Sequence, residues 1–96
     1  MALQSVAVLG LGKVGLLAAR LLDQLGYDVS GHDLREPSEE VPFPVLGTDV
    51  SDADELARAL AGSDAVLSCL PYHCNRLVAE VAHRLGMHYF DLTEDT

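Results

Sequence analysis

The chain has 96 residues, a formal net charge of −9 and 49% apolar residues, which is the composition of one small globular domain. This acidic balance argues against nucleic acid as a partner, because a phosphate backbone would be repelled. No apolar run approaches the roughly 20 residues that a membrane span needs, so we expect no membrane-spanning segment. The N-terminus lacks the basic region of a secretory signal, and two cysteines are too few for a disulfide framework, so the cytoplasm is the expected compartment.

The first third of the chain predicts a strand, a helix and a second strand. Residues 6–9 form a fully apolar run, as expected of a central parallel strand that is buried on both faces. The next residues have helical apolar spacing, which predicts a one-sided stripe facing the core. This stripe consists of Val14, Leu17, Ala18, Leu21, Leu22 and Leu25. Gly26 ends the helix, and residues 27–32 are predicted to form a strand that leads into Asp33.

The middle of the chain predicts a loop, a weak strand and a second helix. Residues 34–42 contain two prolines and three glutamates, which is typical of a solvated loop. Residues 43–48 predict a weaker strand at a sheet edge, because Pro44 cannot donate a ladder hydrogen bond. A helix-start signature at residues 51–54 opens the second helix. The inward stripe of this helix is Ala53, Leu56, Ala57 and Leu60.

The last third predicts a strand at residues 65–70, a helix, and a strand at residues 88–92. The apolar stripe of this helix is Cys74, Leu77, Val78, Val81, Ala82 and Leu85. Strands that alternate with helices of about 12 residues indicate an α/β fold, here a Rossmann-type doubly wound parallel sheet with strand order 3-2-1-4-5. A complete fold of this type has a sixth strand, so we expect residues 1–96 to be one incomplete domain of a larger protein.

A glycine-rich turn joins the first strand to the first helix. Gly10, Gly12 and Gly15 form the pattern G-x-G-x-x-G, which becomes informative because it follows a buried strand and opens an amphipathic helix. Gly10 permits a tight turn, Gly12 lets the backbone approach a pyrophosphate, and Gly15 packs the helix against the strand. We expect them to bind phosphates together with Lys13 and Val14, because a helix N-terminus offers free amides. The alternative is a tight turn without a ligand.

Asp33, at the end of the second predicted strand, is a candidate ribose ligand. It lies near the spacing of about 20 residues at which a carboxylate accepts hydrogen bonds from the adenosine ribose. We expect Asp33, Leu34 and Arg35 to contact the cofactor. A carboxylate repels a 2′-phosphate, so Asp33 favours NAD, while the flanking His32 and Arg35 leave NADP open. The alternative is that Asp33 only caps the loop.

Two further segments follow the third and fourth predicted strands. A doubly wound fold places its adenine pocket near Asp49 and Val50, with Val50 packing on the ring and Asp49 accepting from its amino group. Equally, Asp49 is a helix-start residue. The second segment is Ser68, Cys69, Leu70 and Pro71. It lies where the strand order reverses, so we expect it to line the middle and the nicotinamide half of the cofactor.

Cys69, His73 and Cys74 do not predict a metal site or a nucleophile. The cysteine pair with one histidine lacks the fourth ligand and the usual spacing of a zinc site. Cys74 lies on an apolar helical stripe, where small thiols are common core residues. We therefore expect no metal ligands in this chain.

Four segments together resemble the N-terminal part of saccharopine dehydrogenase-like oxidoreductases, a group that includes lysine 6-dehydrogenase and carboxynorspermidine dehydrogenase. These segments are residues 8–15, 49–52, 68–72 and 88–95, of which the last two are the more selective. The resemblance implies oxidation by NAD or NADP at a carbon bearing an amine, in a small amino-acid-derived substrate, or the reverse reductive condensation. In that family the substrate pocket and proton-transfer residues come mostly from a later domain, so no catalytic residue is assigned here.

Two other functions stay open. One is a non-enzymatic regulatory NAD-binding module of the potassium-transport type, and the other is a structural protein that kept the fold and lost its ligand. The ending at residues 90–95 speaks against the first, and the intact glycine pattern speaks against the second. Residues 88–92 would form an exposed edge strand, which predicts a homo-oligomer, most simply a two-fold dimer.

Overall fold

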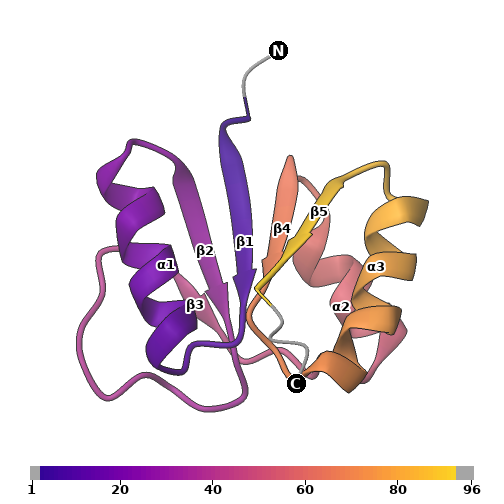
Figure 1. Ribbon diagram of the computed structural model, residues 1–96, viewed down its shortest axis with the longest axis horizontal. Coiled ribbons are helices and arrows are strands. Elements are labelled where there is room, and N and C mark those ends of the chain that lie inside the picture. Colours follow the sequence, from indigo (N-terminus) through magenta and orange to yellow (C-terminus); the bar gives the residue numbers. More distant parts are fainter. Residues whose placement is uncertain (1–2, 93–96) are drawn as a thin grey trace.

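A computed structural model describes residues 3–92, which form a five-stranded parallel sheet with helices on both faces (Figure 1). The strands are β1 (Ser5–Leu9), β2 (Asp28–His32), β3 (Val45–Leu46), β4 (Ala65–Ser68) and β5 (His88–Asp91). The helices are α1 (Lys13–Gln24), α2 (Ala53–Leu60) and α3 (Asn75–Arg84), and the short 3-10 helix η1 (Tyr72–Cys74) precedes α3. Thr93, Glu94 and Asp95, which belong to the family resemblance, lie outside the described residues.

The sheet has the order β3-β2-β1-β4-β5 with all neighbours parallel, which confirms the predicted Rossmann-type architecture. β1 lies between β2 and β4, with Val6 opposite Ala65 and Leu9 opposite Ser68. Figure 1 shows α1 on one face of the sheet and both α2 and α3 on the other. The helix that follows β1 and the helix that follows β4 therefore cover opposite faces of the sheet. Doubly wound folds bind their ligands at the carboxyl ends of the two neighbouring strands where the helices change faces in this way.

The face covered by α2 and α3 holds a large part of the core. The inward-facing stripes predicted for these helices are confirmed at Leu56, Leu60, Val78 and Val81, which are fully buried. The prediction is wrong at Leu85, which follows α3 and is 41% exposed. They pack against residues of β1 and β4. Burial of each such side chain contributes about 1.5–3 kcal/mol. Among residues 3–92, no helix is long and apolar enough to cross a bilayer.

The stripe predicted for α1 is wrong in its orientation. Four of its residues are at least half exposed: Val14, Leu17, Leu21 and Leu25. The buried residues of α1 are Gly15 and Ala19. A Cβ on Gly15 would lie only 1.7 Å from the carbonyl oxygen of Gly10, so α1 sits too close to the β1–α1 turn for a larger side chain. The small residues therefore face the sheet, and much of the leucine-rich side faces outward.

Residues 33–44 connect β2 to β3 without a helix and run beside α1 (Figure 1). Phe43 is buried and returns this segment to the core. Pro44 takes part in the sheet through its carbonyl oxygen, which accepts a hydrogen bond from the Gly31 N–H at 2.8 Å. β3 lies at the sheet edge, as predicted, but it has only two residues. β3 ends at Leu46, and the side chain of Thr48, two residues later, contacts the ring of His32.

Candidate dinucleotide-binding site

The turn between β1 and α1 places its three glycines in different environments. Gly10 has φ +86°, a conformation that side chains rarely adopt, and its N–H donates to the His32 carbonyl at 2.9 Å. Gly15 is fixed by the close approach of the Gly10 carbonyl. Gly12 differs from both, because its φ is −70° and, apart from its two chain neighbours, no described residue has an atom within 4 Å of the position that its Cβ would occupy. Neither conformation nor packing within residues 3–92 requires glycine at position 12.

The N-terminus of α1 lacks side-chain partners for its first amides. Gly12 is the N-cap residue and supplies no side-chain hydrogen bond, and the first turn contains no acidic residue. Lys13 and Val14 are exposed at this end. The first N–H groups of a helix have no intrahelical acceptor, and the helix dipole adds positive potential there. The start of α1 is therefore suited to bind an anion.

Asp33 connects the end of β2 to the glycine turn. Its Oδ2 accepts a hydrogen bond from the Leu11 N–H at 2.7 Å, and its Oδ1 accepts one from the Arg35 N–H at 3.1 Å. The structure thus brings Asp33 to the turn, with Leu34 and Arg35 exposed beyond it. The loop-capping role weighed from the sequence is present. Each carboxylate oxygen has a second lone-pair site, so the capping contacts leave capacity to accept from ribose hydroxyls.

His32 lies on the buried side of this region. Its ring is 1% exposed, with Nδ1 3.0 Å from Thr48 Oγ1 and Nε2 3.0 Å from Ser30 Oγ. Burial lowers the pKa of His32 below its ordinary value, so the imidazole is neutral at pH 7. The sequence left His32 open, with Arg35, as a ligand for a 2′-phosphate, but the buried ring has both nitrogens paired inside the protein and is not accessible to a phosphate. The pairing with Thr48 had no signal in the sequence.

Asp49 and Val50 lead from β3 into α2. Asp49 Oδ1 accepts hydrogen bonds from the Ser51 hydroxyl at 2.6 Å and from the Ser51 N–H at 3.0 Å. These bonds, the hydroxyl first, lower the pKa of Asp49. The N-cap of α2 is Asp52 rather than Ser51, because its carboxylate accepts from two N–H groups of the first turn at 3.0 and 3.2 Å. The helix-start role of Asp49 is therefore present, while its adenine role stays a prediction.

Residues 68–71 continue from β4 at the same edge of the sheet. Ser68 is fully buried, and its hydroxyl donates to Asn75 Oδ1 at 2.6 Å, so this side chain fastens β4 to the start of α3. The Cys69 N–H donates to the Leu9 carbonyl at 2.8 Å, which places the backbone after β4 against the glycine turn. The Cys69 thiol is partly buried, which raises its pKa. Such a thiol is a poor nucleophile.

Two cavities border this edge of the sheet. The first, of about 620 Å³, lies between η1, α3 and β5 and is lined in part by Tyr72, Arg76 and Tyr89. The hydroxyl of Tyr89 donates to Asp91 Oδ2 at 3.0 Å in its wall. In the part of the chain that the structure describes, no group of three or more His, Cys, Asp or Glu side chains is placed to hold a metal ion.

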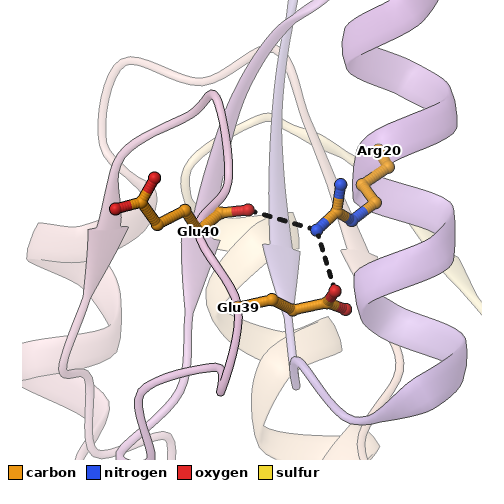
Figure 2. Close-up of polar contacts among 3 residues, drawn as sticks. All are labelled: Arg20, Glu39 and Glu40. Carbon is orange, nitrogen blue, oxygen red and sulfur yellow. Dashed lines mark hydrogen bonds and ion pairs between the residues drawn. The ribbon is translucent and has the colours of Figure 1, made fainter.

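The second cavity, of about 500 Å³, lies between α1 and residues 33–44. It adjoins an ion pair that sequence reasoning missed. Arg20 of α1 places Nη2 3.4 Å from Glu39 Oε2, and the same nitrogen donates to the Glu40 carbonyl at 3.2 Å (Figure 2). These contacts hold the segment against the helix. No local pattern predicts them, because the partners lie about twenty residues apart in a loop and a helix.

Solved structures share this fold. Apo saccharopine dehydrogenase (L-Glu forming) from Saccharomyces cerevisiae is 23% identical with a TM-score of 0.76, and covers 97% of this chain and 22% of that one. A short-chain dehydrogenase/reductase superfamily protein from Agrobacterium tumefaciens with bound NAD is 21% identical with a TM-score of 0.78, covering 92% and 32%. Uronate dehydrogenase from Agrobacterium tumefaciens is 20% identical with a TM-score of 0.69, covering 90% and 38%. The chain therefore spans less than half the length of these structures.

The family comparison is more specific than the shared fold. The sequence matches the saccharopine dehydrogenase NADP binding domain over residues 6–95. This range includes the glycine turn, Asp33, residues 49–50 and residues 68–71. The chain belongs to the saccharopine dehydrogenase NADP-binding domain family, and it is an NAD(P)-binding domain of the Rossmann type.

Proposed function

We propose that this domain binds the pyrophosphate and adenosine of the cofactor at the carboxyl edge of its sheet, with NAD favoured over NADP. The observation that carries the proposal is the contrast within the glycine turn. Gly10 and Gly15 are required by the protein's own geometry, whereas Gly12 faces open space beside the uncapped start of α1. A residue without a side chain at that point permits close approach of a pyrophosphate to the helix amides.

The remaining contacts follow from the order of the strands. The ribose hydroxyls would donate to Asp33, near the exposed Leu34 and Arg35, and Val50 would pack on the adenine with Asp49 beside it. Asp49 keeps Oδ2 for this contact, because Ser51 uses Oδ1. The nicotinamide half would follow the backbone of residues 69–71, which lies against the turn. Ser68 supports this segment from inside, since its hydroxyl is held by Asn75.

We propose further that the domain serves an oxidoreductase acting on an amino-acid-derived amine. When bound, the nicotinamide exchanges a hydride with the carbon that bears the amine. This chain's residues hold and orient the cofactor for that exchange, and the cavity of about 620 Å³ beside β5 lies at the nicotinamide end of the proposed site. The family match and the likeness to saccharopine dehydrogenase support this reaction class.

We also propose a cellular compartment and an oligomeric state for the enzyme. Cys69 and Cys74 are both free thiols, as suits the reducing cytoplasm. The expected assembly is a homo-oligomer. Such an amine oxidation would place the enzyme in amino-acid metabolism.

Titration calorimetry with NAD and NADP tests the binding site. Gly12→Val should abolish binding of both cofactors, because its side chain would fill the space where the pyrophosphate approaches the helix. Ala61→Val is the control, since it also introduces a valine, at an exposed position after α2 and toward the opposite edge of the sheet. It should leave both affinities within twofold of the native values. Native protein that shows no binding heat up to millimolar cofactor would refute the proposal.

A further inference from the structure

We infer that the cavity between α1 and residues 33–44 selects between NAD and NADP, and that Glu39 closes it to the 2′-phosphate by occupying Arg20. The inference rests on the proposed function, because it takes the adenosine ribose to lie at Asp33. It adds a second determinant of cofactor choice, on a segment that carries no cofactor motif.

The cavity between α1 and residues 33–44 lies next to the place where we expect the adenosine ribose. Leu11 lines the cavity of about 500 Å³, and the N–H of the same residue donates to Asp33 Oδ2 at 2.7 Å. Gly12 and Lys13 of the glycine-rich turn line this cavity as well. A group carried on a ribose hydroxyl beside Asp33 is therefore directed to the mouth of this cavity.

The donors in and beside the cavity suit a phosphate. The chain has only six Lys and Arg residues against 15 Asp and Glu, yet Lys13 and Arg20 both line this space. Ser38 adds a hydroxyl, and Arg35 follows Asp33 closely in the chain. Within residues 3–92, neither Lys13 nor Arg35 forms an ion pair. Ammonium, guanidinium and hydroxyl groups together form a typical phosphate-binding set.

Glu39 opposes this set from inside the same cavity. Its Oε2 lies 3.4 Å from Arg20 Nη2, so the carboxylate competes with a phosphate for the same guanidinium (Figure 2). The two side chains are 36% and 60% exposed, and ion pairs of that exposure are weak. A phosphate dianion competes for Arg20 but also meets the repulsion of Glu39. The expected result is NAD preference with weaker binding of NADP.

Arg20 also contacts the backbone of Glu40, so the Glu39 side chain can be changed without removing every contact between the segment and α1. The Glu40 carbonyl accepts from Arg20 Nη2 at 3.2 Å, so the guanidinium keeps one anchor when the Glu39 carboxylate is removed (Figure 2). Glu39→Gln therefore removes the negative charge that competes for Arg20 without detaching the segment from α1. Glu36→Gln is the matched control, because Glu36 is exposed on the same segment and does not line the cavity.

Calorimetric titration of the native chain and both variants with NAD and NADP tests the inference. Glu39→Gln should raise the affinity for NADP about fivefold and leave that for NAD within twofold, since only NADP carries the 2′-phosphate. Glu36→Gln should change both affinities less than twofold. Lys13→Gln should weaken NADP binding more than NAD binding.

Three other outcomes would contradict the inference, and they distinguish its failure from failure of the proposed function. If Glu39→Gln and Glu36→Gln shift the ratio of the two affinities equally, the effect is long-range charge and the inference is wrong. If the native chain binds NAD but Glu39→Gln leaves the ratio unchanged, the inference fails while the proposed function stands. If the native chain binds neither cofactor, the proposed function and the inference fall together.

Discussion

The helices α1 and α2 begin at the same edge of the sheet but in opposite ways. α2 is capped by the Asp52 carboxylate and carries Asp54 and Glu55 in its first turn. α1 has Gly12 as its N-cap, no side-chain cap and no acid in its first turn. A side-chain cap typically contributes about 1 kcal/mol, and α1 does without it. α1 therefore lacks the side-chain cap and the first-turn acids that α2 has, at a helix start where we expect a ligand to supply the missing partner. The start of α3 also lacks both, but the short helix η1 precedes it.

The largest expected effect concerns the glycine that holds α1 in place. Gly15→Ala would bring a Cβ to 1.7 Å from the Gly10 carbonyl oxygen, so the helix must move away from the turn. We expect a loss of at least about 3 kcal/mol in the free energy of unfolding, measured by urea denaturation. Gly12→Ala adds the same methyl group in open space and should cost less than about 1 kcal/mol. Equal losses in the two variants would contradict this account of the turn.

The next effect is on cofactor preference at the ribose position. Asp33→Ser removes the charge that disfavours a 2′-phosphate, so the ratio of NAD to NADP affinity should fall about tenfold, or reverse. Asp28→Ser, at the other end of β2, removes the same charge far from the turn and should leave the ratio unchanged. Titration calorimetry measures both. Tighter binding of NADP by the native protein would assign the preference to Arg35 instead of Asp33.

A smaller effect is expected at the capped helix. Asp52→Ala leaves two N–H groups of α2 without their acceptor, so the free energy of unfolding should fall by about 1 kcal/mol. The affinity for NAD should stay within twofold, because this cap has no part in the site. Asp52→Asn, which can still cap, should recover most of the stability. A strong loss of NAD binding in Asp52→Ala would mean that the two helix starts are not separate in function.

The last expected effect is a dependence of stability on pH, through the histidine that joins the regions before α1 and α2. Burial lowers the pKa of His32 from 6.5, so the unfolded chain binds the proton more readily than the folded one. Stability should therefore be full above pH 6.5 and fall below it, by at most about 1.4 kcal/mol for each pH unit. Urea unfolding at pH 7.5 and 5.5 measures this. His32→Gln should remove this part of the pH dependence, and an unchanged dependence would assign it to other groups.

Much of the fold could be predicted because its signals are local. The apolar runs, the helical periodicities and the helix-ending glycines gave the order of the elements, and the alternation of strands and helices gave the sheet order. Pro44 correctly indicated an edge strand, since its missing N–H is a property of the residue itself. The structural roles of Gly10 and Gly15 were also predictable, because each depends on the neighbouring residues in the turn. The role of Gly12 toward a pyrophosphate stays a prediction.

The features that could not be predicted depend on distances between separate segments. The periodicity of α1 identifies an apolar side but not which side meets the sheet, and the contact of Gly15 with Gly10 decides this in favour of small residues. The hydrogen bond from Ser68 to Asn75 and the ion pair between Arg20 and Glu39 join elements whose spacing no local pattern records. Helix-start residues were located correctly as a group, but Asp52 rather than Ser51 has the capping geometry.

The hydrogen bond from the Leu11 N–H to the Asp33 carboxylate helps to fix the shape of the glycine-rich turn without any ligand. Ordering a loose turn at each encounter would cost about 1–2 kcal/mol per residue in backbone entropy. Here that entropy is lost once, when the domain folds. A nicotinamide dinucleotide bound as we propose would meet a backbone already in the receiving shape, so less of its binding free energy would go into ordering the turn.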